Sequence, residues 1–211
     1  MRAKNTKTAE TAVLSDWQKS RLTRQERMMR SMLAPASLDL VNRSPERARW
    51  FCLVVRDGSE IAVGKRLMEG GVDTLVPTET VERRTAKGVK YEVELAFFVG
   101  YVFARFIPSN DAFERLRKVK SVFDFLRFGE RYHEVRDSDL GFYLGDIHRL
   151  PKDKTIGEKD KVQIIYGPFS GVKAVVLQVL KLKSRDPVCR VWSELYQREI
   201  KNVPLAFLQR L

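Results

Sequence analysis

Short apolar runs alternate with helical patterns in a regular order from Trp50 onward. Residues 50–55 form a run rich in aromatic and β-branched side chains, which is typical of a central strand. Residues 60–70 place their apolar positions on one face of a helix. Further strands are predicted at 72–76, 93–106 and 122–128, with helices from Asn110 or Asp111 and from Asp137 or Ser138, and a polar excursion at 78–91. The order β-α-β-β-α-β-α predicts an α+β sandwich of helices on one antiparallel sheet.

After Gly157 the pattern consists of strands only. Apolar runs at 162–165, 172–182, 188–192 and 200–207 are separated by turns, and residues 151–157 form a short linker before them. Roughly fifty residues of short strands predict a small all-β barrel with closed edges and little core. Its obligatory apolar positions are expected to be Val162, Ile164, Val175, Val179, Val191 and Leu205.

The segment before Trp50 lacks this regular pattern. Residues 1–13 are polar and predict disorder, and Ser15 or Asp16 is expected to cap a helix through about Met32. Apolar and basic side chains are interspersed along this helix, so it suits nucleic acid, a membrane surface, a partner groove or simply a frayed, solvated extension. Pro35 and Pro45 bracket a predicted linker that ends near Arg49.

Composition and charge restrict the class of protein. The 211 residues carry a formal net charge of +12, divided as +6 over 1–49, +1 over 50–157 and +5 over 158–211. Basic ends favour polyanionic partners, whereas the near-neutral middle favours a protein partner. No stretch reaches the length of a membrane span and no secretory signal is present, so no membrane association is expected and a cytoplasmic protein is predicted. Cys52 and Cys189 are expected to be buried, reduced thiols.

The sequence offers no support for catalysis. His133 and His148 have no nucleophile or metal-ligand spacing around them, and Glu92 and Glu94 suit a solvated strand edge. Neither a cofactor nor a metal is indicated, so a binding protein is predicted.

Two separate motifs resemble the NusG family of transcription elongation and antitermination factors, which includes the specialised RfaH type. Trp50-Phe51, Glu60, Val76-Pro77-Thr78-Glu79 and the run 97–103 resemble the family's N-terminal domain, NGN, over residues 49–150. The pattern from Asp160 to Gly171 resembles a KOW module over residues 158–211. The resemblance implies a ferredoxin-like NGN sandwich followed by an SH3-like KOW barrel, with residues 1–48 as a basic extension.

The run 97–103 is a candidate interaction site. In one continuous strand, Phe97, Val99, Tyr101 and Phe103 share one face, whereas Phe98, Gly100 and Val102 share the other. The resemblance places Phe98, Tyr101 and Phe103 in a hydrophobic depression that receives the β′ clamp helices of RNA polymerase. The alternative assigns these rings to the core. Val99 stands where the family usually has proline.

Basic residues on the helix after Asn110 suggest phosphate contacts. Arg115, Arg117, Lys118 and Lys120 form either an ordinary solvated face or a phosphate-binding face. The resemblance implies that this helix faces the non-template DNA strand, and that the surface extends to Arg56, Lys65 and Arg66.

Phe169 lies in a turn bounded by Gly167 and Gly171, which can present its ring at the barrel surface. The resemblance implies that this loop docks a ribosomal protein or a termination factor; the alternative is a core plug. The sequence therefore predicts an elongation and antitermination factor that rides on RNA polymerase and recruits a second protein. The basic extension, Val99 and Arg127-Phe128-Gly129 favour a specialised paralogue. A ribosome-associated RNA-binding protein that uses the KOW module is the alternative.

Overall fold

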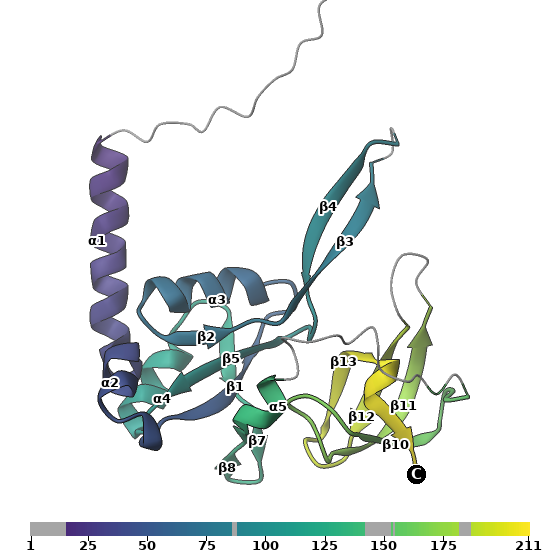
Figure 1. Cartoon of the computed structure of the whole chain (residues 1–211). Coiled ribbons are helices and arrows are strands. Elements are labelled where there is room, and N and C mark those ends of the chain that lie inside the picture. Colours follow the sequence, from purple (N-terminus) through teal and green to yellow (C-terminus); the bar gives the residue numbers. More distant parts are fainter. Residues whose placement is uncertain (1–15, 86–87, 142–152, 154, 182–186) are drawn as a thin grey trace, which may run out of the picture.

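A computed structural model describes residues 16–85, 88–141, 153, 155–181 and 187–211 (Figure 1). Its N-terminal sheet is antiparallel, with strand order β2-β5-β1-β6 and β9 paired to β1. These strands are β1 (Arg49–Val55), β2 (Asp73–Leu75), β5 (Tyr101–Phe106), β6 (Val122–Phe125) and β9 (Glu134–Val135). The predicted α+β class is confirmed.

Helices α3 (Glu60–Glu69) and α4 (Asn110–Arg117) cover one face of the N-terminal sheet. Alternate residues of β1 and β5 point to this face, because successive side chains along a strand lie on opposite sides. Ser109 caps α4, since its side chain accepts a hydrogen bond from the Ala112 amide at 3.2 Å, so the cap lies just before the predicted Asn110 or Asp111. The helix-side core consists of Phe51, Leu53, Val55, Val102, Ala104 and Phe106 packed with Val63, Leu67, Phe113 and Leu116.

The segment before β1 belongs to this same core. The predicted helix is present as α1 (Asp16–Leu33), whereas the predicted linker is wrong. That linker contains η1 (Ala34–Ala36), α2 (Leu38–Arg43) and η2 (Pro45–Arg47), and Ala36 and Val41 are buried. Leu38 also donates its amide hydrogen to the Gly71 carbonyl at 2.7 Å. The segment is ordered because its scattered apolar side chains cover the end of the helix layer; the predicted disorder at 1–13 lies outside the described residues.

A long hairpin projects from the N-terminal sheet (Figure 1). Strands β3 (Thr78–Arg84) and β4 (Lys90–Ala96) pair from Thr78 opposite Ala96 to Arg84 opposite Lys90. The predicted polar excursion is therefore wrong. The predicted single strand at 93–106 is also wrong, because β4 ends at Ala96 and the chain turns before β5 begins.

The C-terminal sheet is antiparallel, with order β13-β12-β11-β10-β14. Its strands are β10 (Lys161–Ile164), β11 (Lys173–Leu180), β12 (Val188–Ser193), β13 (Arg198–Pro204) and β14 (Leu208–Arg210), with η5 (Leu205–Phe207) before the last. Four of the six expected core positions are buried: Val162, Ile164, Val191 and Leu205.

Val175 and Val179 are only half-buried, which corrects the prediction for these two positions. Val175 pairs with the exposed Trp192, whereas its neighbours Ala174 and Val176 point inward. The side chains of β11 therefore alternate in the phase opposite to the one predicted at Val175.

The remaining described elements are small. A hairpin of β7 (Arg127–Phe128) and β8 (Arg131–Tyr132) precedes α5 (Asp137–Gly141). The third predicted helix thus begins as expected, while its continuation and most of the predicted linker lie outside the described residues. No helix in the described part of the chain is long and apolar enough to cross a membrane.

Candidate functional site

The predicted polymerase-binding residues gather on the face of the N-terminal sheet opposite α3 and α4. Tyr101 pairs with Val54 and Phe103 pairs with Cys52, and all four side chains belong to the same cluster. The Phe98 ring joins them, with its centroid 6.4 Å from that of Phe103. The expectation that Phe98 faces the opposite side is wrong, because the chain is not a strand between Ala96 and β5.

Glu60, at the start of α3, holds the turn that positions these rings. Its side chain is 3% exposed, and Oε1 accepts the amide hydrogens of Gly100 at 2.6 Å and Gly58 at 3.0 Å. Gly100 has φ of +86°, which favours glycine. A carboxylate can be buried at low cost when it receives such hydrogen bonds. The sequence singled out Glu60 as a family mark and a helix start only, since no local signal pairs it with a turn forty residues away.

The C-terminal sheet covers this aromatic face. Phe98, Tyr101 and Phe103 are 1%, 3% and 0% exposed, respectively. The Phe169 ring lies 5.5 Å from Phe98 and 5.2 Å from Tyr101 between centroids, in edge-to-face geometry. Phe169 is itself 1% exposed, so the expected presentation at a free surface is wrong. The turn carries the ring outward from its own sheet and inserts it between aromatic side chains of the other sheet.

Polar contacts surround these rings at one edge of the interface. The Tyr101 hydroxyl donates to the Glu199 carbonyl at 3.5 Å, and Lys201 forms an ion pair with Asp57. The Arg198 guanidinium lies 5.6 Å from the centre of the Tyr101 ring, a cation–π distance. Burial raises the pKa of Tyr101. Tyr101 is therefore held as a neutral phenol that can donate this hydrogen bond.

The Arg198 side chain also brings a cost to the interface. Its Nε is buried and has no hydrogen-bond partner in the described structure. A buried unpaired donor costs about 1–3 kcal/mol. The closed arrangement is consequently less stable than its aromatic packing alone implies.

His133 lies at the other edge of the interface. Its Nε2 lies 3.2 Å from the Pro168 carbonyl oxygen, and its Nδ1 lies 3.2 Å from the Tyr196 hydroxyl. Burial lowers the pKa of His133, although the Pro168 carbonyl and the carboxylates of Asp139 and Glu134 oppose this shift. The neutral imidazole is therefore the form that suits the contact.

The predicted nucleic-acid residues divide into two groups. Arg66 donates from Nη1 to the Lys120 carbonyl at 2.9 Å, and the amide of Arg56 donates to Ser121 at 2.9 Å. These bonds bring the end of β1, α3 and the segment after α4 together, with Lys65 exposed on α3. The other group lies on or just after α4 and forms ion pairs: Arg115 with Asp111, Arg117 with Asp124 and Lys118 with Glu114, at 3.2, 3.9 and 2.6 Å.

Burial of the two cysteines agrees with the sequence. Cys52 and Cys189 are both buried and free, and burial raises the pKa of each thiol. Neither thiol has the exposure or lowered pKa of a reactive cysteine.

Comparison with known proteins supplies the family. Residues 48–141 match the family model described as transcription termination factor nusG. The transcription termination/antitermination protein NusG of Vibrio cholerae serotype O1 is 28% identical over 159 residues, covering 69% of this chain and 86% of that protein. The protein of the same name from Synechocystis is 23% identical over 168 residues, covering 68% of this chain and 80% of the relative.

A solved structure of Thermotoga maritima NusG, described as showing domain interaction, aligns with 79% of this chain and 98% of its own length at 19% identity and a TM-score of 0.42. The segment matched by the family model includes the sheet, α3 and α4, and it carries the Phe98, Tyr101 and Phe103 cluster. On the strength of the family model and the sequence relatives, this chain belongs to the NusG family.

Proposed function

We propose that this chain is a transcription elongation and antitermination factor that binds RNA polymerase through Phe98, Tyr101 and Phe103, and that it acts by binding rather than by catalysis. The proposal is supported by the names of the NusG relatives and by the position of the three rings within the family-matched segment. Aromatic side chains that become desolvated at the centre of an interface are the usual hot spots of protein association. The β′ clamp helices are the proposed partner.

In this proposal the C-terminal sheet and the polymerase compete for one surface. The observation that carries it is the insertion of Phe169 against Phe98 and Tyr101. A surface occupied by Phe169 has no room for a polymerase helix, so binding requires the sheet to move away. Phe169 would then become free to dock a ribosomal protein or a termination factor. Each partner therefore shifts the population towards the open form that it binds.

The basic side chains have a separate role in the proposal. Arg56, Lys65, Arg66 and Lys120 are proposed to contact phosphates of the non-template DNA strand, because three of them come from neighbouring segments joined by backbone hydrogen bonds. Arg115, Arg117 and Lys118 contribute less, since local carboxylates already neutralise part of their charge. Phosphate contacts position a strand without reading its sequence.

The test is equilibrium binding of the full chain to purified bacterial RNA polymerase. Phe169→Ala should tighten binding, because it removes the ring that covers Tyr101 and leaves the proposed polymerase surface intact. Leu177→Ala is the matched control, since Leu177 is an exposed apolar side chain of β11, and it should leave the affinity unchanged. Adding Tyr101→Ala to Phe169→Ala should abolish the gain. A Phe169→Ala protein that is folded and binds no better would contradict the competition, and binding to ribosomal RNA without any binding to polymerase would contradict the function.

A further inference from the structure

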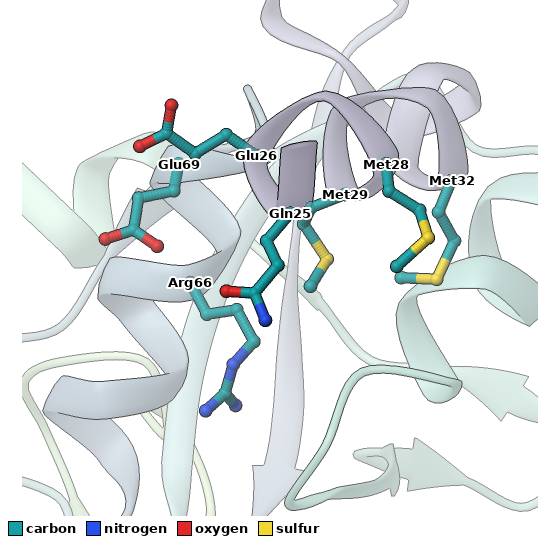
Figure 2. Close-up of a pocket in the computed structure, with 7 residues that line it drawn as sticks. All are labelled: Gln25, Glu26, Met28, Met29, Met32, Arg66 and Glu69. Carbon is teal, nitrogen blue, oxygen red and sulfur yellow. The ribbon is translucent and has the colours of Figure 1, made fainter. Parts of the chain in front are cut away.

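A pocket lies between α1 and α3, away from the interface with the C-terminal sheet (Figure 2). Its volume is about 360 Å³. The residues that line it are Gln25, Glu26, Met28, Met29 and Met32 from α1, with Arg66 and Glu69 from α3. Because α1 precedes residue 48, where the family match begins, one wall of this pocket comes from outside the family domain. The pocket therefore calls for an explanation that the proposed function does not supply.

The two walls of the pocket are held together at the lower end of α1. A Cβ atom on Gly70 would lie 2.5 Å from Leu33 Cδ1 and 3.1 Å from Met29 Cγ, so only glycine permits this close approach. Arg30 donates from Nε to the Glu69 carbonyl at 3.2 Å. These contacts fix α1 beside α3, and the pocket is a groove between two packed helices.

The floor of the groove is apolar and adaptable. Met28 is 69% exposed, and Met29 and Met32 are half-buried. In Figure 2 these three side chains extend from α1 on the side where the Arg66 guanidinium lies. Methionine is unbranched and polarisable, and it is over-used at surfaces that accept varied apolar side chains. The groove thus offers a seat for apolar side chains of a partner.

The charge around this floor is mainly positive. Arg24 lies one helical turn before Met28 and so on the same side of α1, Arg66 lines the groove, and the Lys120 carbonyl accepts the Arg66 hydrogen bond. Within the described ranges, neither Arg24 nor Lys120 is recorded in an ion pair. Glu26 and Glu69 are the acidic members of the lining. The excess of cations favours a ligand that carries negative charge.

We infer that this groove binds an amphipathic helix with an acidic polar face, presented by a protein partner. An apolar stripe at i, i+3, i+4 and i+7 would rest on the three methionines, while carboxylates beside the stripe would face Arg24, Arg66 and Lys120. A nucleic acid would use the cations but would leave the methionine floor unused. The inference does not depend on the proposed polymerase contact, which involves the other face of the sheet.

The test uses the full chain labelled with ¹³C at its methionine methyl groups, of which the sequence has five. The probe is a synthetic helical peptide of leucine and glutamate with leucine at heptad spacing. Its addition should shift the signals of Met28, Met29 and Met32 and leave that of Met68 in place. Met68 is a matched reference, because it is 53% exposed but lies two residues after Arg66, on the other side of α3.

Substitutions then separate the floor from general charge attraction. Met28→Gln should weaken peptide binding about fivefold or more, because it removes apolar area without changing charge or a buried side chain. Met68→Gln should change it by less than about twofold. The inference is overturned if a scrambled peptide of the same composition binds equally well, if Met28→Gln has no effect, or if an oligothymidylate shifts the three methionines and the peptide does not.

Discussion

The two faces of the N-terminal sheet carry similar apolar side chains but are covered in different ways. On one face, Phe51, Phe106 and Phe113 pack with centroids about 5 Å apart, beneath helices that are close in sequence. On the other face, Tyr101 and Phe98 meet Phe169, which arrives from a separate sheet about seventy residues later in the chain.

Polar groups also distinguish the two covers. Contacts between the sheets include the Lys201–Asp57 ion pair, the His133 contacts and the unpaired Nε of Arg198. Among the described residues, the helix-covered cluster contains apolar and aromatic side chains. An apolar cover is a permanent core, whereas an apolar contact with a polar rim and an unpaired donor resembles an interface between partners. The comparison suggests that one face holds the fold together and the other can be uncovered.

The largest expected effect comes from the helix-covered face. Phe106→Ala should lower the free energy of unfolding by about 3–5 kcal/mol, because it leaves a cavity among Phe51, Phe113 and Phe125. Urea unfolding measures this change. Phe123→Ala, at an exposed phenylalanine, is the control and should cost less than about 0.5 kcal/mol. Equal costs for the two variants would remove the distinction between core and surface on this sheet.

A smaller effect is expected at the turn that positions the interaction face. Glu60→Ala should cost about 2 kcal/mol, because two buried amides, of Gly58 and Gly100, lose their acceptor. Glu60→Gln keeps an oxygen acceptor and should cost clearly less. Hydrogen exchange of residues 97–103 should accelerate in Glu60→Ala. If exchange is unchanged there, Glu60 does not hold the turn.

The ion pair between the sheets provides a weaker lever. Lys201→Glu places like charges at Asp57 and should disfavour the closed form by about 1 kcal/mol, since the pair is partly exposed. Faster hydrogen exchange at residues 98–103, without a change in urea unfolding of the helix-covered core, is the expected signature. Lys181→Glu alters an exposed lysine for which no ion pair is recorded in the described residues, and it serves as the control. The same acceleration in both variants would attribute the effect to net charge alone.

The smallest effect is expected from pH. Burial lowers the pKa of His133 in the closed form, so the open form binds a proton more readily. The contribution of His133 to closure is complete above the ordinary histidine pKa of about 6.5 and decreases as the pH falls below it. Hydrogen exchange of residues 98–103, corrected for its intrinsic pH dependence, should therefore show more opening at about pH 5.5 than at pH 7.5. His133→Gln should flatten this difference, and an unchanged difference would exclude His133 as its source.

Periodic elements were predictable from the sequence, whereas long-range contacts were not. β1, α3 and α4 have clear strand or helix patterns, and they lie close to where the patterns place them. The β3–β4 hairpin was missed because charged residues occur on both of its faces, and a hairpin that projects from the body has little apolar alternation. The packing of residues 34–47 was missed because Ala36 and Val41 are too far apart to form a periodic pattern.

The candidate site was predictable in its residues but not in its state. The resemblance selected Phe98, Tyr101, Phe103 and Phe169, and the structure brings all four together. Their mutual burial depends on a contact between Phe169 and rings about seventy positions earlier, which no local pattern encodes. The methionine groove was missed for the same reason, because α1 and α3 supply different walls.

The central claim, that the C-terminal sheet and RNA polymerase compete for one aromatic face, has a direct test. Cysteines introduced at Asp57 and Lys201, which form an ion pair across the interface, can be joined by a short bismaleimide, while the buried Cys52 and Cys189 are protected from the reagent. The measurement is the affinity of the crosslinked chain for purified RNA polymerase, compared with the same double variant before crosslinking. Competition predicts that crosslinking abolishes binding and that the uncrosslinked variant binds. A crosslinked chain that binds polymerase as tightly as the uncrosslinked one would contradict the claim.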